Sequence, residues 1–216
     1  MTGLSERFTE ALLLATSLHR NDVRKGTSIP YIAHLLGVCE LVLGDGGDED
    51  EAIAALLHDA IEDHADSVSA ADIEQRFGAS VRRIVEGCTD TPADYRGGEK
   101  PDWRLRKEAY LAHIVQTPPA DLRVSIADKL YNARAILADL LEIGDRVFDR
   151  FKASKGDVLW YYRSVSAAFV AAGASGRLVT ELADTVRTLE AEADRAGEVA
   201  IKNQEVDDLG RRNAAA

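Results

Sequence analysis

Cysteine is scarce in this sequence, and the two cysteines present are isolated. Neither Cys39 nor Cys88 belongs to a C-x-x-C pair. Such spacing disfavours both a zinc ribbon and a disulfide framework. Two isolated thiols fit a reducing compartment, so we expect a cytoplasmic protein.

Long apolar runs are also missing. No stretch approaches the roughly 20 apolar residues that a membrane-spanning helix needs. The first residues, Met1 to Arg7, do not combine a basic segment with an apolar one. We therefore expect neither a membrane partner nor a secretory signal.

Positive charge is in deficit, because 26 Lys and Arg residues face 37 Asp and Glu residues, giving a net charge of −11. An acidic surface repels nucleic-acid phosphates, so we expect no nucleic-acid partner. Against this background the basic cluster His19 to Lys25 is conspicuous. It is either a solvated helix end, where cations favour the dipole, or a receptor for an anionic ligand.

Strand signals are weak, because few segments alternate apolar and polar residues with period 2. We therefore predict an all-α fold, with one domain over residues 1–200 and a polar, frayed tail over 201–216. The longest internal loop is expected over 90–102, where glycine and proline gather. The expected helices cover residues 5–20, 30–43, 48–63, 69–78, 80–88, 103–116, 121–141, 157–172 and 177–196.

Two histidines and two aspartates lie in mostly apolar helical stretches. The pair His58-Asp59 follows the run Ala-Ala-Leu-Leu, while His34 and Asp128 belong to two other expected helices. Burying an ionisable pair costs several kcal/mol unless the pair is neutralised by a partner or a metal. The four residues are therefore candidate ligands of one divalent ion. Nitrogen and oxygen donors are compatible with manganese, iron or zinc.

Each candidate ligand also has a simpler interpretation. A single histidine on an apolar helix is more often a core or surface residue than a ligand. Asp128 has Lys129 and Arg134 nearby as possible salt-bridge partners. The other histidines lack comparable contexts, and we interpret them as structural or solvated: His19, His64 and His113.

Glu62 and Asp63 follow the His-Asp pair at a spacing of four residues, which places them on the same helical face. Two carboxylates beside a metal ion can orient a water molecule and accept its proton. The alternative is a solvated acidic turn, but carboxylates at a helix C-terminus oppose the dipole. We therefore predict that Glu62 and Asp63 are catalytic.

The ordered set of motifs resembles the HD-domain metal phosphohydrolases, whose signature is H…HD…D. It is most similar to the hydrolase domain of the bifunctional alarmone enzymes of the stringent response and to the small alarmone hydrolases. The similarity extends over roughly residues 11–165. The similar segments are 19–20 with 24–25, 30–34, the HD-x-x-ED segment 56–63, the FG-x-x-V segment 77–85, and 127–134, which resembles AD-K/R-L-x-N-x-R.

The resemblance implies an HD-domain helical bundle that hydrolyses the 3′-pyrophosphate of guanosine tetra- or pentaphosphate, giving GDP or GTP and pyrophosphate. It also implies roles for individual residues. Glu62 and Asp63 would position and activate the attacking water. The implied manganese ligands are His34, His58, Asp59 and Asp128. The implied substrate contacts are Arg24 and Lys25 for the phosphates, and Tyr131 and Asn132 for the nucleotide.

Four departures leave the nucleotide open. The usual pattern of the bifunctional enzymes differs at the stretch Gly26–Ile29, at Leu35 and at Ser125, and the loop over 90–102 matches no segment of the family. One alternative is a phosphohydrolase of another nucleotide or of a nicotinamide dinucleotide phosphate. Another is a nucleotide sensor without catalysis, although a pure binder has no need of Glu62 and Asp63. Any of these takes a small-molecule nucleotide, and the oligomeric state stays open.

Overall fold

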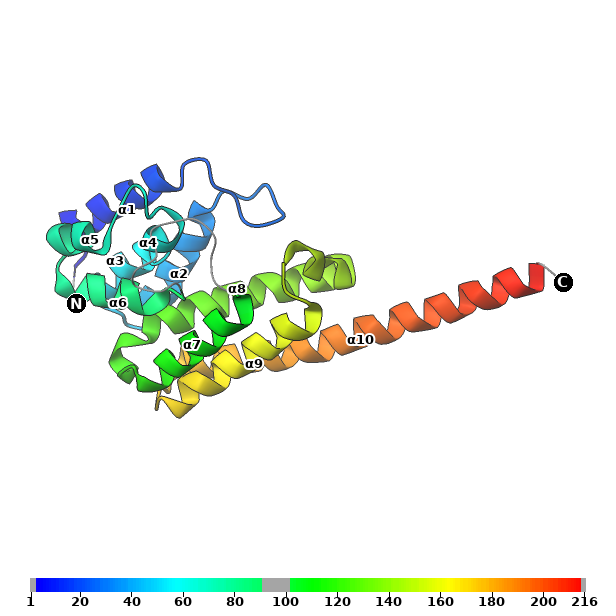
Figure 1. The fold of residues 1–216 in the computed structure, drawn as a ribbon. Helices are drawn as coiled ribbons and strands as arrows, with labels where there is room; N and C mark the ends of the chain where they lie inside the picture. Colours follow the sequence, from blue (N-terminus) through cyan, green and yellow to red (C-terminus); the bar gives the residue numbers. More distant parts are fainter. Residues whose placement is uncertain (1–2, 91–101, 215–216) are drawn as a thin grey trace.

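The computed structural model describes residues 3–90 and 102–214, with side chains described as far as residue 197. Within these ranges there is no β-strand, only an isolated bridge between Val23 and Pro30, and the predicted all-α fold is confirmed (Figure 1). The α-helices are α1 (Glu6–Leu18), α2 (Ile32–Gly44), α3 (Glu49–Leu57), α4 (Ala60–Asp63), α5 (Ala70–Phe77), α6 (Ala79–Cys88), α7 (Trp103–Gln116), α8 (Arg123–Ile143), α9 (Lys155–Ala171) and α10 (Arg177–Ala214); two 3₁₀ segments are η1 (Pro119–Asp121) and η2 (Gly144–Arg150).

Local capping explains where several helices begin. Ser5 caps α1 by accepting a hydrogen bond from the amide of Arg7. Asp48 and Ser69 each form a reciprocal capping box at the start of α3 and α5, which satisfies otherwise unpaired amides of the first turn. The predicted capping box at Ser69 is thus confirmed. Gly78 ends α5 with φ of 94°, a conformation that L-residues rarely adopt.

Two expected helices differ from the prediction. The helix expected to carry both His58 and Glu62 is broken into α3 and α4, because Asp59 adopts φ −95° and ψ −6° and turns the chain between them. The last helix does not end near residue 196 but continues to Ala214, so residues 201–214 of the tail expected to be frayed are helical (Figure 1). Its sequence contains no proline to stop the helix. The loop expected over 90–102 lies almost entirely outside the described residues.

Helix α8 occupies the middle of the bundle. It packs against α2, α3 and α6 from the N-terminal half and against α9 and α10 from the C-terminal half (Figure 1). Leu35 on α2, Leu57 on α3 and Leu130 on α8 are fully buried. Each such side chain contributes about 1.5–3 kcal/mol to folding. These contacts fix three helices whose polar residues meet beside the core.

None of the helices in the described part of the chain is both long enough and apolar enough to span a bilayer.

Candidate metal centre

Four polar side chains from three places in the fold converge on one point. His34 lies on α2, His58 and Asp59 lie at the turn between α3 and α4, and Asp128 lies on α8. The His34 Nε2 atom is 3.2 Å from His58 Nε2 and 3.3 Å from Asp128 Oδ1. The Asp59 Oδ2 atom is 3.0 Å from His58 Nε2 and 3.5 Å from His34 Nε2. The structure therefore brings together all four predicted ligands.

These spacings fit the donor atoms of a single ion. Ligand atoms at about 2.0–2.1 Å from a metal lie about 3.0 Å apart in an octahedron and about 3.3 Å apart in a tetrahedron. His34, His58 and Asp59 each offer one atom, and these atoms lie within 4.8 Å of one another. Asp128 Oδ1 adds a fourth donor, 3.6 Å from His58 Nε2. The chemistry of the donor set and its spacing thus both suit a divalent metal.

The electrostatics of the cluster call for a cation. Burial tends to raise the pKa of the Asp59 and Asp128 carboxyls, but neighbouring cations outweigh it and hold both pKa values well below the usual range. The main opposing charge is His58 for Asp59 and Lys129 for Asp128. Burial also tends to lower the pKa of His58, yet the two carboxylates raise it well above its ordinary value. A metal would replace the proton on His58.

Hydrogen bonds orient the candidate ligands. The ring of His58 is held by a 2.8 Å contact between its Nδ1 atom and the Ala55 carbonyl oxygen, which leaves Nε2 facing the cluster. The Tyr31 hydroxyl donates to Asp59 Oδ2 over 2.6 Å. Such outer contacts fix the direction and basicity of metal ligands. Tyr31 was not among the predicted site residues, although its position three residues before His34 was a usable signal.

Asp128 has partners on both carboxylate oxygens. Lys129 Nζ donates to Oδ2 and Asn132 Nδ2 donates to Oδ1, each over 2.5 Å. The salt bridge considered for Asp128 is therefore real for Lys129, while Arg134 pairs with Glu181 instead. The salt bridge and the metal site are compatible, because Oδ1 is the atom that faces the two imidazoles.

The predicted substrate residues divide into two groups. Arg24 donates to Asn132 Oδ1 over 2.8 Å, and its guanidinium carbon lies 5.7 Å from the centre of the Tyr131 ring. The Tyr131 ring in turn lies 5.1 Å from the His34 ring. Arg24, Tyr131 and Asn132 therefore adjoin the cluster. Lys25 points elsewhere, with its ammonium group 5.5 Å from the centre of the Phe151 ring.

Glu62 and Asp63 lie on α4, the short helix that follows Asp59. The Glu62 Oε2 atom accepts a 2.9 Å hydrogen bond from the hydroxyl of Thr89. Asp63 is exposed. Burial raises the pKa of Tyr31 most, and the negative charges of Asp59 and Asp63 raise it further. The charge of Asp63 therefore helps to keep the proton on the Tyr31 hydroxyl, which donates to the candidate ligand Asp59.

A group of cations beside the cluster was missed in the sequence. Lys107 Nζ donates to Asp90 Oδ2 over 2.5 Å and lies 4.5 Å from the centre of the Tyr161 ring. Burial and the charge of Lys129 lower the pKa of Lys107. The run Arg-Leu-Arg-Lys over residues 104–107 was the available signal. Nothing in the local sequence placed it near Lys129.

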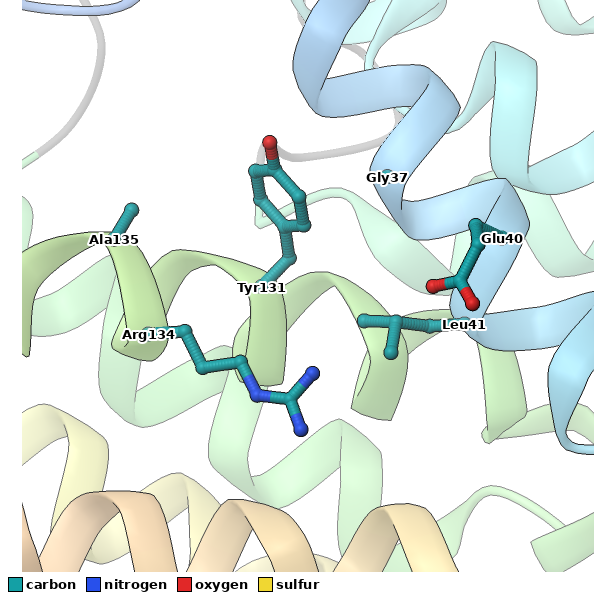
Figure 2. Close-up of a pocket in the computed structure, with 6 residues that line it drawn as sticks. All are labelled: Gly37, Glu40, Leu41, Tyr131, Arg134 and Ala135. Atoms are coloured by element: carbon teal, nitrogen blue, oxygen red, sulfur yellow. The ribbon is translucent and has the colours of Figure 1, made fainter. Parts of the chain in front are cut away.

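A pocket of about 380 Å³ lies between α2 and α8, and the Tyr131 ring forms one of its walls (Figure 2). Glu40 and Arg134 bring charged groups to it, and Leu41 and Ala135 bring apolar ones. Gly37 completes the lining. A Cβ atom at Gly37 would lie 2.0 Å from Tyr131 Cε2, so the ring is seated directly on the glycine.

The bundle and its convergent histidines and aspartates define a helical protein with the geometry of a metal centre. The HD domain family matches residues 11–154, which is most of the chain, and the chain belongs to this family. The resemblance seen in the H…HD…D signature is thus confirmed.

Curated relatives extend this result. The chain is 38% identical over 128 residues to guanosine-3′,5′-bis(diphosphate) 3′-pyrophosphohydrolase MESH1 of Xenopus tropicalis, covering 58% of this chain and 66% of that protein. It is 36% identical over 138 residues to the human MESH1 protein, covering 62% and 72%. The match to the bifunctional (p)ppGpp synthase/hydrolase SpoT of Escherichia coli is 31% over 137 residues, covering 61% of this chain but 18% of SpoT.

Solved structures share the fold. One is described as a metazoan ortholog of SpoT that hydrolyses ppGpp; it has a TM-score of 0.69 and 24% identity, and it covers 87% of this chain and 97% of its own. A second, lmo0812 from Listeria monocytogenes, has a TM-score of 0.61 and 23% identity, covering 74% and 99%. At these identities the likeness establishes the fold alone.

Proposed function

We propose that this protein is a metal-dependent hydrolase of the 3′-pyrophosphate of guanosine tetra- or pentaphosphate. The main support is a set of side-chain nitrogen and oxygen atoms whose contacts measure 3.0–3.6 Å. These atoms belong to His34, His58, Asp59 and Asp128. The activity in the names of the MESH1 relatives supports the choice of substrate. The metal we propose is manganese, held by those four side chains.

The proposed reaction makes use of the charges around the centre. A divalent metal held by the four side chains would supply Lewis acidity to the phosphate and would lower the pKa of water from about 15.7 toward neutrality. Glu62 and Asp63 orient the water and accept its proton. The water oxygen bonds to the phosphorus next to the 3′ oxygen, and the 3′ O–P bond breaks. Pyrophosphate leaves, and the 3′ oxygen regains a proton.

The nucleotide would lie along the polar surface beside the cluster. Arg24 offers a guanidinium group to the phosphates, since carboxylates and phosphates match its planar donors. Tyr131 and Asn132 flank the same place, and the pocket behind Tyr131 is large enough to receive part of a nucleoside. The contacts support Arg24 more directly than Lys25, because Lys25 is directed toward Phe151. Lys25 stays a proposed phosphate ligand.

A single hydrolase domain up to about residue 200 stays part of this proposal. Leu182, Leu189 and Ala193 of α10 are buried, so that helix belongs to the same packed core over this length. Residues 201–214 continue the helix beyond these buried positions, and we propose that 201–216 is a polar tail outside the domain.

The test measures pyrophosphate release from guanosine tetraphosphate by the chelator-treated protein, with and without added manganese. We expect release only with metal. Asp59→Ala should abolish it, because the variant loses a donor and a charge from the centre. The matched control is Asp66→Ala, which removes an exposed carboxylate that contacts Ser67. Full turnover by Asp59→Ala would overturn the proposed centre.

A substrate panel separates the proposed reaction from its alternatives. Guanosine tetraphosphate, other nucleotides and a nicotinamide dinucleotide phosphate should be compared under identical manganese concentrations. Preference for another substrate would replace the proposed nucleotide but keep the centre. Tight binding of every nucleotide without turnover would identify a sensor.

A further inference from the structure

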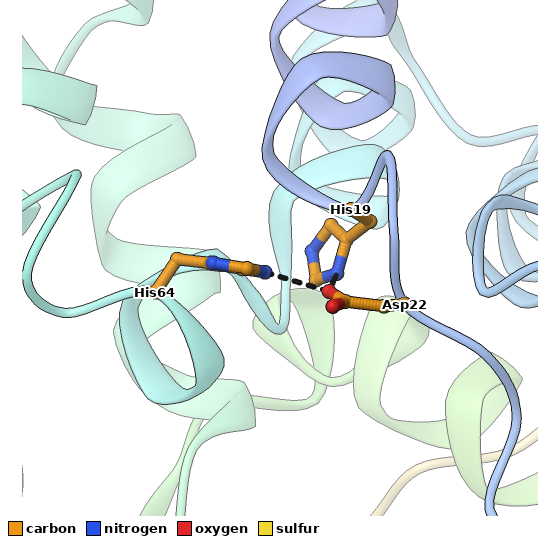
Figure 3. Close-up of side chains that lie close together, drawn as sticks. All are labelled: His19, Asp22 and His64. Carbon is orange, nitrogen blue, oxygen red and sulfur yellow. Dashed lines mark hydrogen bonds and ion pairs between the residues drawn. The ribbon is translucent and has the colours of Figure 1, made fainter.

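A second group of side chains that could hold a metal ion lies outside the candidate centre. His19 follows the end of α1, Asp22 lies in the loop after it, and His64 follows the end of α4. His19 Nδ1 is 2.9 Å from Asp22 Oδ2, and His64 Nε2 is 2.8 Å from the same oxygen. Both imidazoles are directed toward the carboxylate (Figure 3). From the sequence alone, both of these histidines are expected to be structural or solvated.

The arrangement fits a small transition-metal ion. The three side chains each offer one ligand atom, and those atoms lie within 4.8 Å of one another. The two imidazole rings are nearly perpendicular, at 84°. Zinc at about 2.0–2.1 Å from its donors requires a separation of about 3.3 Å in a tetrahedron. The two nitrogen–oxygen distances of 2.9 and 2.8 Å are each a few tenths of an ångström shorter than that.

The cluster is buried on the side of His19 and open to solvent on the side of His64 and Asp22. The side chain of His19 is 1% exposed, whereas His64 is 20% and Asp22 is 38% exposed. An ion can therefore enter from solvent, and water can complete its coordination. Three protein ligands with one position left open is a common zinc arrangement.

The protonation states also favour ligation. Burial lowers the pKa of His19 and outweighs the opposing effect of its hydrogen bond with Asp22. Burial tends to raise the pKa of Asp22, but hydrogen bonds from His64 and His19 outweigh it and lower that pKa. The two lowered pKa values favour a neutral His19 and an ionised Asp22. These are the forms that bind metals.

We propose that His19, Asp22 and His64 form a second divalent-metal site, suited to zinc and separate from the centre at His34, His58, Asp59 and Asp128. An ion there ties the loop that carries Arg24 to the end of the helix that carries Glu62. The two sites are adjacent, because the His19 ring stacks on Tyr31 at 4.9 Å and the Tyr31 hydroxyl donates to Asp59. Zinc at the second site is therefore placed to affect the first.

The experiment counts zinc bound by the full-length, metal-free protein, using calorimetric titration and elemental analysis after gel filtration. We expect two equivalents for the wild type and one for His64→Gln and for Asp22→Asn. The matched control is His113→Gln, which removes an exposed histidine of α7 and should keep two. Circular dichroism checks that each variant keeps its helices.

A cobalt spectrum identifies which site is filled. Asp59→Ala, which disables the first centre, should still bind one Co²⁺ with the intense visible absorption of tetrahedral coordination, and adding His64→Gln should remove that absorption. One equivalent in the wild type that His64→Gln leaves in place would overturn the second site. Asp22 would then be only a hydrogen-bond acceptor for two imidazoles. Loss or retention of pyrophosphate release by Asp59→Ala judges the first centre independently.

Discussion

Replacing Gly37 by alanine tests whether the position of Tyr131 matters for nucleotide binding. The new Cβ atom would lie 2.0 Å from Tyr131 Cε2, 2.6 Å from Cδ2 and 2.8 Å from Cζ. Ordinary contact begins at 3.4 Å, so the ring and the new methyl group must separate by 3.4 − 2.0 = 1.4 Å. The ring cannot do this without leaving its place beside His34 or its contact with Ala33.

The expected cost of Gly37→Ala is that of overpacking, about 1–3 kcal/mol of unfolding free energy. For a chain of this size each kcal/mol lowers Tm by about 2–4 °C, so the expected loss is roughly 2–12 °C. Calorimetry or denaturant titration measures it. The KM for guanosine tetraphosphate should rise because the ring that adjoins Arg24 has moved, while kcat changes less.

Two further variants distinguish a steric clash at Gly37 from other causes of destabilisation. Gly87→Ala is the matched control, because its nearest neighbour would be His113 Nε2 at 3.9 Å, an ordinary contact. Alanine in place of a helical glycine should then stabilise the protein by about 0.5–1 kcal/mol. In a Tyr131→Ala background, Gly37→Ala should cost nothing further. A destabilisation of equal size in that background would refute the steric explanation.

Two further predictions concern the centre itself. Manganese affinity should rise with pH until the raised pKa of His58 is passed, because below that pKa the metal must displace a proton from the imidazole. Calorimetry in buffers of different ionisation enthalpy should detect one released proton. An affinity that does not change with pH would contradict the assignment of His58 as a ligand. Asn132→Ala should weaken manganese binding by about 10–100-fold, because Asn132 donates a hydrogen bond to Asp128 and accepts one from Arg24. An unchanged affinity would show that Asp128 keeps its orientation without the Asn132 hydrogen bond.

The sequence predicted much of the fold because its signals were local. Ser69 with Asp72 predicted a capping box, and both of its hydrogen bonds are present. The helix over 103–116 was predicted with the observed ends: prolines follow it in the sequence, and the structure adds a cap at Asp102. The break at Asp59 was not predicted, since apolar periodicity and helix-forming residues continue on both sides of it.

For the candidate centre too, the sequence predicted the residues with local signals and not the contacts between distant segments. The ionisable pair His58-Asp59 beside buried leucines was visible in the sequence, and the structure places its expected companions within reach. The partnership of Tyr31 with Asp59 joins residues 28 positions apart, and that of His64 with Asp22 joins residues 42 apart. Neither leaves a periodic signal, because both depend on how α1, α2 and α4 meet.

The turn at Asp59 fixes the directions in which the side chains of α4 point. From Asp59, Glu62 is reached within a single turn of α4, so the candidate ligand and the proposed proton acceptor share one short piece of backbone. One residue inserted between them would swing the glutamate about 100° around the helix axis while leaving the aspartate where it is. The spacing HD-x-x-ED is thus a rotational constraint as much as a set of residue types. A chain that kept every one of these side chains but changed the interval would no longer direct the proposed proton acceptor toward the candidate centre.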